Sequence, residues 1–269
     1  MKRLLLASTV LAVGGQLFVS PALAAPPRPA VSSFSWTGCY IGVHAGAGWN
    51  RNSISQPFNP AIQTITPVGS FVDVDSGADF LGGGQVGCDY QFANSWVVGV
   101  QGDVTWGNLS GQANDPFFAG KDGGPLTLHA KTNWTASATA RIGYAWDRML
   151  VYGTVGPAWA HNKYSIQNVE TFGNPNFQFC VNLFPVACNP DGSDTRLGWT
   201  LGIGLEWAFA NNWSAGLAYN HFDFGTRSVT LSDPRGNSGG AVSEAFDVKQ
   251  RIDTVKLSIN YRFGWPGVR

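Results

Sequence analysis

The chain has 269 residues, with 17 Lys and Arg against 17 Asp and Glu, and only 13% of its residues are charged. Near-neutrality with so few charges argues against a nucleic-acid-binding protein, which would show a basic stripe. Its 34 Gly and 11 Trp fit short strands with aromatic ends better than helices, because Gly weakens helices and Trp favours strands.

Residues 1–24 have the pattern of a secretory signal peptide. A basic start at Lys2 and Arg3 precedes an apolar run, and the small residues Ala22 and Ala24 indicate a cleavage site. The alternative is an N-terminal membrane anchor, but the run is short for a bilayer span. Removing the signal leaves 15 basic and 17 acidic residues, a net charge of −2 (15 − 17). Residues 25–33 are predicted to be an extended, Pro-rich periplasmic spacer.

Residues 34–263 are predicted to form one β-barrel. No stretch after the signal approaches the roughly 20 apolar residues of a transmembrane helix. Apolar and polar residues instead alternate with a period of two, which is the signature of strands. The expected strands cover residues 38–49, 80–92, 96–106, 133–146, 149–161, 196–209, 213–220 and 255–263. The predicted fold is therefore all-β: an eight-stranded antiparallel up-and-down transmembrane β-barrel.

The connections between these strands alternate between very short and very long. Phe92 to Trp96, Trp146 to Leu150 and Phe209 to Trp213 leave only hairpin turns. The long polar stretches are expected at residues 50–77, 107–130, 162–195 and 225–246. Short turns on the periplasmic rim and four long loops outside are typical of outer-membrane barrels.

The facing of the fifth strand, residues 149–161, is left open by the sequence. A two-residue turn at Asp147 and Arg148 would send Val151, Val155 and Trp159 outward. A three-residue turn would instead send out Tyr152, Thr154 and Ala158, because a slip of one residue exchanges the two faces of a strand.

Alternation does not show which face is outside, but the aromatic residues favour an apolar exterior. They lie near both ends of the apolar face, as expected for two girdles at the membrane interfaces. A soluble barrel would have its apolar face inside. The predicted girdle residues are Trp96, Trp106, Trp134, Trp146, Trp199, Trp207, Phe209, Trp213, Tyr261 and Phe263.

The polar face of the strands combines many Gly with a few charged side chains. An eight-stranded barrel has an interior just wide enough for side chains to fill it, so charges there must pair. We expect one packed internal network, with Gln85 and Gln101 as hydrogen-bonding filler. Its charged members are Asp103, Arg141, Glu206, Lys256 and Arg262.

The four cysteines are expected to form two disulfides, because an exported chain meets an oxidising compartment. If residue 50 pairs with residue 77 across the first hairpin, Cys39 faces Cys88 directly, since both pairs sum to 127. Cys180 and Cys188 lie eight residues apart in one long loop. The predicted pairs are Cys39 with Cys88 and Cys180 with Cys188; two other connectivities remain open.

Several segments resemble the small porin-like outer-membrane β-barrel proteins of alpha-proteobacteria, of the opacity or OmpA-like type. They are FSWTGCYIG at 34–42, GGGQVG at 82–87, NSWVVGV at 94–100, ARIGYA at 140–145, GWT at 198–200, GLE at 204–206, NWS at 212–214 and NYRF at 260–263. The resemblance covers essentially the whole mature chain. It implies location in the bacterial outer membrane, surface or envelope-integrity roles, and no catalytic residues.

The chain departs from that family at two places. Members usually end at the aromatic residue that the outer-membrane assembly machinery reads, whereas here the tail 264–269 follows Phe263. Cys39 and Cys88 stand where an aromatic residue is more usual. The resemblance implies that the lipid bilayer of the outer membrane and the assembly machinery are the partners of this chain. The effect of the tail on assembly is left open by the sequence.

No residue constellation indicates catalysis, a cofactor or a metal. No Ser, Cys, His or carboxylate arrangement supports nucleophilic or acid–base chemistry, and the four His lack metal-ligand spacing. The chain is therefore expected not to be an enzyme. The leading hypothesis is an outer-membrane surface protein with a structural, envelope-integrity or interaction role; the alternatives are a porin for small solutes and a soluble ligand-binding barrel.

Overall fold

The computed structural model describes residues 34–55, 71–114, 127–167, 191–233 and 242–263. The predicted signal peptide, spacer and C-terminal tail lie outside these residues, as do Cys180 and Cys188. Among the described residues, none forms a helix with the length and apolar character needed to cross a membrane.

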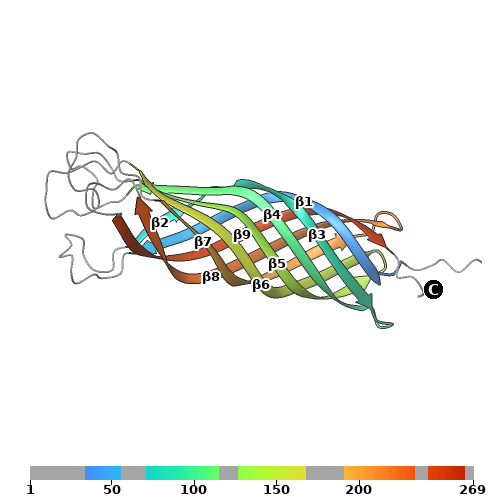
Figure 1. The fold of residues 1–269 in the computed structure, drawn as a ribbon. Helices are drawn as coiled ribbons and strands as arrows, with labels where there is room; N and C mark the ends of the chain where they lie inside the picture. Colours follow the sequence, from blue (N-terminus) through green and yellow to red (C-terminus); the bar gives the residue numbers. More distant parts are fainter. Residues whose placement is uncertain (1–33, 56–70, 115–126, 168–190, 234–241, 264–269) are drawn as a thin grey trace, which may run out of the picture. The chain divides into compact units, whose positions relative to one another are not determined.

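The described chain consists of antiparallel strands, most of which pair with the next strand along the chain (Figure 1). The strands are β1 (Gly38–Ser55), β2 (Phe71–Asp75), β3 (Asp79–Gln91), β4 (Trp96–Asn114), β5 (Thr127–Trp146), β6 (Met149–Gln167), β7 (Asp191–Trp207), β8 (Trp213–Asp233) and β9 (Val242–Phe263).

The sheet closes on itself, because β1 also pairs with β9, from Cys39 opposite Phe263 to Ser55 opposite Asp247. The short strand β2 pairs with the far part of β1, and β3 pairs with its near part. The two occupy one position in the ring, which therefore has eight strands. The predicted eight-stranded up-and-down barrel is confirmed.

The hairpin after β5 settles the facing of β6. Trp146 pairs with Met149, so the turn has two residues, and Asp147 adopts the left-handed backbone conformation with φ of 52° that such a turn uses. Val151, Val155 and Trp159 consequently point outward, while Tyr152 and Thr154 are buried. The two-residue alternative is the correct one.

The apolar face of the strands is the outer face. Val100 of β4 and Leu201 of β7 are 63% and 53% exposed, whereas polar side chains on the opposite face of the same strands, such as Thr105 and Thr200, point inward and are buried. Trp96 and Trp106 on β4 lie ten residues apart on this face, a rise of about 34 Å along the strand. At a tilt of about 40° this spans about 26 Å along the barrel axis, close to the apolar band of a membrane barrel.

All ten predicted girdle residues lie on the outer face or at its ends. Near the short turns, Trp96 packs on Tyr144 with ring centres 5.8 Å apart, and Trp213 packs on Tyr261 at 5.0 Å. Near the other end, Trp106 and Trp134 are direct partners on β4 and β5. Trp134 and Tyr261 are half-buried, and the remaining girdle residues are exposed: Trp96, Trp106, Trp146, Trp199, Trp207, Phe209, Trp213 and Phe263.

The predicted long connections are shorter than expected, because the strands continue past the apolar band. β1 runs to Ser55, β4 to Asn114, and β9 begins at Val242 instead of near Val255. In these extensions the two faces exchange character: Ile54, Leu128 and Val248 point inward and are buried, while polar residues point outward. Beyond the membrane the outside of a barrel meets water, so the pattern inverts and the sequence alternation misleads.

Candidate functional site

A buried Trp closes the interior at the short-turn end. Trp36 precedes β1 and has no exposed surface. Its indole Nε1 donates to the carbonyl of Asp147 (3.2 Å), and its backbone N–H donates to Gln91 Oε1 (2.8 Å). Val97, Leu150 and Ala208 belong to the same buried cluster. The chain entering the barrel therefore folds inward and fills its end.

Next to Trp36, farther from the short-turn end, lies a group of four buried charges: Asp89, Arg141, Glu206 and Arg262. Arg262 donates to the carbonyl of Trp36 (2.6 Å) and to Asp89 Oδ2 (3.0 Å). Arg141 forms an ion pair with Glu206, and its Nη1 lies 3.5 Å from Asp89 Oδ2. Each of these four side chains is at most 4% exposed. We call this group the four-charge cluster.

Neutral donors complete the four-charge cluster. Ser214 Oγ and Asn260 Nδ2 donate to Glu206 Oε1 at 2.6 and 3.1 Å. Arg141 also donates to the hydroxyl of Tyr40 (3.0 Å), and its guanidinium carbon lies 3.6 Å from the centre of the Tyr152 ring. Buried charges are tolerated only when paired and hydrogen-bonded, and here most of the polar atoms of the cluster have partners.

The remaining two predicted charges form a separate pair. Lys256 Nζ lies 2.8 Å from Asp103 Oδ2 and 2.9 Å from Thr105 Oγ1. His44 Nε2 is 2.9 Å from the same hydroxyl. Direct ion pairs therefore divide the five predicted charges into this pair and three members of the four-charge cluster, namely Arg141, Glu206 and Arg262.

The predicted filler residues link neighbouring layers. Gln101 accepts from the Tyr40 hydroxyl (2.8 Å), and Gln85 Nε2 donates to Asn260 Oδ1 (2.6 Å). Two inner glycines make room for the rings of this region. A Cβ at Gly87 would lie 2.5 Å from Tyr40, and one at Gly204 would lie 2.3 Å from Tyr152, so only Gly fits at these positions.

Sequence reasoning missed Asp89, although charge balance could have found it. The five predicted residues carry two negative and three positive charges, a net of +1. Asp89 lies on the same inward face of β3 as Gln85, and it brings the net charge of these six residues to zero. Since an unpaired charge is costly in a filled interior, the imbalance itself pointed to a missing acid.

The filling continues toward the long-connection end in three further layers. Lys256 Nζ lies 5.8 Å from the ring of Phe222, which belongs to a buried apolar cluster with Leu109 and Ile252. Next comes a polar layer, in which Gln250 Nε2 donates to Asn162 Oδ1 (2.8 Å) and Thr132 Oγ1 (2.9 Å).

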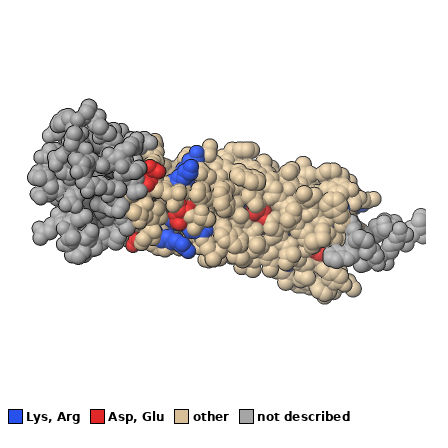
Figure 2. All heavy atoms as spheres, in the orientation of Figure 1, with Lys and Arg blue, Asp and Glu red and all other residues tan. Residues whose placement is uncertain are grey.

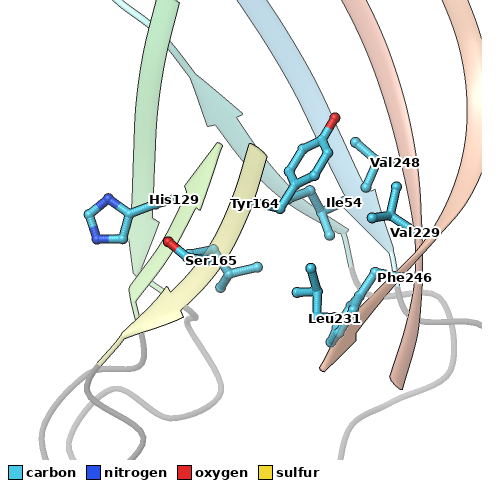
Figure 3. A pocket seen from close by; sticks show the side chains of 9 residues that line it. Ile54, His129, Tyr164, Ser165, Val229, Leu231, Phe246 and Val248 are labelled. Carbon is cyan, nitrogen blue, oxygen red and sulfur yellow. The ribbon is translucent and has the colours of Figure 1, made fainter. Parts of the chain in front are cut away.

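The last layer is apolar and holds a small pocket (Figure 3). Arg196, fully buried, lies below it: Arg196 Nε is 2.8 Å from Asp194 Oδ2, and its guanidinium carbon is 5.8 Å from the ring of Tyr164. Figure 3 shows side chains from several strands around the pocket. Its lining residues are Ile54, Leu128, His129, Tyr164, Ser165, Val229, Leu231, Phe246 and Val248.

Cys39 and Cys88 form a disulfide between β1 and β3. They are direct register partners, as the sum of 127 predicted. The predicted pair Cys180 with Cys188 lies outside the described residues. Among the residues that the structure describes, no group of three or more His, Cys, Asp or Glu could hold a metal ion.

Comparison with known proteins finds similarity to outer-membrane β-barrel proteins in sequence and in structure. A family model described as outer membrane protein beta-barrel domain matches residues 17–263. The 31 kDa outer-membrane immunogenic protein of Brucella melitensis is 30% identical over 95% of this chain and 99% of its own length. The 22 kDa outer membrane protein of Rhizobium leguminosarum is 26% identical over 67% of this chain and 66% of its own. The crystal structure of OprG from Pseudomonas aeruginosa aligns with a TM-score of 0.49 and 13% identity, covering 86% of this chain and 99% of that one. The chain belongs to the outer-membrane protein β-barrel family, and it is an outer-membrane protein.

Proposed function

We propose that this protein is a closed barrel that anchors surface-exposed connections in the outer membrane and serves a structural or interaction role. The observation that carries the proposal is the stack of buried layers from Trp36 through the four-charge cluster to the apolar layer around Tyr164. Each layer contains side chains with less than one tenth of their surface exposed. A barrel so filled holds its strands rigidly and leaves no wide aqueous bore.

The outward side of the proposal rests on chain length and on the relatives. The connections at the end opposite the short turns include residues 56–70, 115–126, 168–190 and 234–241. In outer-membrane barrels the longer connections face the cell exterior. The Brucella relative is named an immunogenic protein, which supports surface display in this family. No enzymatic step is proposed, because the buried charges are already committed to one another.

The porin alternative is less well supported, and conductance separates the two functions. Wild-type protein reconstituted into planar bilayers is expected to give no steps above those of a mock purification, while a 16-stranded porin gives clear steps in the same apparatus. Lys256 lies in the middle of the interior stack, so it reports on any lumen. Conductance steps in the wild type whose ion selectivity shifts in Lys256→Gln would show an open pore and overturn the proposal.

A further inference from the structure

Two basic side chains on the outer surface lie directly opposite each other on neighbouring strands. Lys131 of β5 is the register partner of Lys163 of β6, and both are exposed. Like charges facing each other across a strand pair destabilise a sheet. Neither Lys forms an ion pair with another described residue. The arrangement is therefore unfavourable unless an anion that the described residues do not supply lies against it.

Hydroxyl groups flank this pair on both sides. Ser110 of β4 is the partner of Lys131, and Ser193 of β7 is the partner of Lys163. All four side chains are exposed and thus lie in one row across four strands. With strands about 4.8 Å apart, the row is about 14 Å long. Ammonium and hydroxyl donors in a row are suited to phosphate oxygens.

The height of the row on the barrel points to a lipid. Lys131 lies three residues beyond Trp134, which is about 8 Å past the aromatic girdle along the axis. Directly below, Trp134 stacks on His161 with ring centres 6.0 Å apart, and the exposed apolar strip continues through Trp159 and Leu197. A headgroup phosphate on the row would leave its acyl chains against this strip.

A second pair of opposed cations provides an internal comparison. Arg51 of β1 and Arg251 of β9 are also register partners on the outer face. Here the chain supplies its own acids: Arg251 Nε is 3.2 Å from Asp223 Oδ2, and Arg51 Nη1 is 4.0 Å from Asp253 Oδ2. On the face that Figure 2 shows, the Lys and Arg atoms lie together with Asp and Glu toward one end of the barrel, and the middle has only a small acidic patch. Among the residues that the structure describes, by contrast, neither lysine of the pair Lys131 and Lys163 has an ion-pair partner.

We propose that Ser110, Lys131, Lys163 and Ser193 form a binding site for the phosphate group of a phosphorylated outer-leaflet lipid, with its acyl chains on the strip below. The location in the outer leaflet rests on the proposed outward direction of the long connections. Binding in detergent does not depend on that direction or on conductance, so failure of this proposal is distinguishable from failure of the closed-barrel proposal.

The test is native mass spectrometry of the full chain with diphosphorylated lipid A, and with the same lipid after removal of its phosphates. Wild type is expected to bind the phosphorylated lipid about 30-fold more tightly than the double variant Lys131→Gln, Lys163→Gln, at roughly fivefold for each lysine. Lys131→Arg with Lys163→Arg should retain binding. The matched control, Arg51→Gln with Arg251→Gln, should lose less than threefold, since those cations are already paired.

Equilibrium unfolding adds a second test, because the stability difference between wild type and the lysine double variant should depend on whether phosphorylated lipid A is present. Without anionic lipid, the lysine double variant should unfold at the same or a higher denaturant concentration than wild type, because repulsion is removed. With phosphorylated lipid A present, wild type should become the more stable. The proposal is overturned by equal binding of both lipid forms, by equal losses in the lysine and arginine variants, or by inorganic phosphate displacing the lipid at equal concentration.

Discussion

Replacing Glu206 by Ala is expected to lower the free energy of unfolding by about 3–5 kcal/mol, the usual cost of breaking a buried ion pair. Glu206 is the partner of the buried Arg141, and it accepts from Ser214 and Asn260. Its removal leaves a fully buried guanidinium short of a counter-charge in the middle of the barrel. Urea unfolding from phospholipid vesicles, followed by heat-modifiable migration on gels, measures the loss.

Two companion variants separate the buried charge from other effects. Glu206→Gln keeps an oxygen for Ser214 but removes the charge, so its destabilisation should be smaller than that of Glu206→Ala. Arg251→Gln breaks an ion pair on the outer surface and should cost about 0–1 kcal/mol. A loss below about 1 kcal/mol for Glu206→Ala would contradict the four-charge cluster.

Replacing Val100 by Arg is expected to destabilise the barrel by about 2–4 kcal/mol in a bilayer, the cost of a cation at the midplane. Val100 is 63% exposed and lies between Trp96 and Trp106 on the outer face of β4. Its new guanidinium would therefore face acyl chains. Refolding into vesicles at a series of urea concentrations gives the difference from wild type.

Gln112 on the same strand supplies the control for this substitution. It is exposed on the outer face, six residues beyond Trp106, where the strand has left the apolar band. Gln112→Arg should change stability by about 0–1 kcal/mol, because the depth dependence is steep. Equal effects of the two arginines, or a neutral Val100→Arg, would show that the outer face of β4 is not in lipid.

The fold could be predicted because strand alternation and turn length are local properties of the sequence. Residues such as Ile203 and Leu205, separated by single polar or small residues, determine their own faces once one face is known. The facing of β6 needed one more fact, the two-residue length of the turn between Trp146 and Met149, because one more residue in the turn would exchange the two faces of the strand after it.

The upper parts of the strands could not be predicted by the same rule. Ile54 and Val248 pair across β1 and β9 and point inward, while Ser53 and Lys249 beside them point outward. In this part of the barrel the apolar side chains are inside and the polar ones outside, as in a soluble barrel, whereas the part between the aromatic girdles has the opposite arrangement. The periodicity remains, but its meaning reverses where the surrounding medium changes from lipid to water.

The interior site was only partly predictable, because pairing depends on register between distant strands. Inward charges could be read from the chain, but not that Lys256 lies beside Asp103 whereas Arg262 lies beside Asp89. Those contacts join residues 153 and 173 positions apart. The excess of one positive charge among the five predicted residues indicated that an acid was missing, without any knowledge of register.

The claim that the outer face lies in lipid is tested most directly by a nitroxide spin label at position 201. Leu201 lies in the middle of β7 and is 53% exposed. With the protein in phospholipid vesicles, the account predicts that dissolved oxygen relaxes the label strongly and that a water-soluble nickel chelate hardly does. Strong relaxation by the chelate with weak relaxation by oxygen would place Leu201 in water and contradict the account.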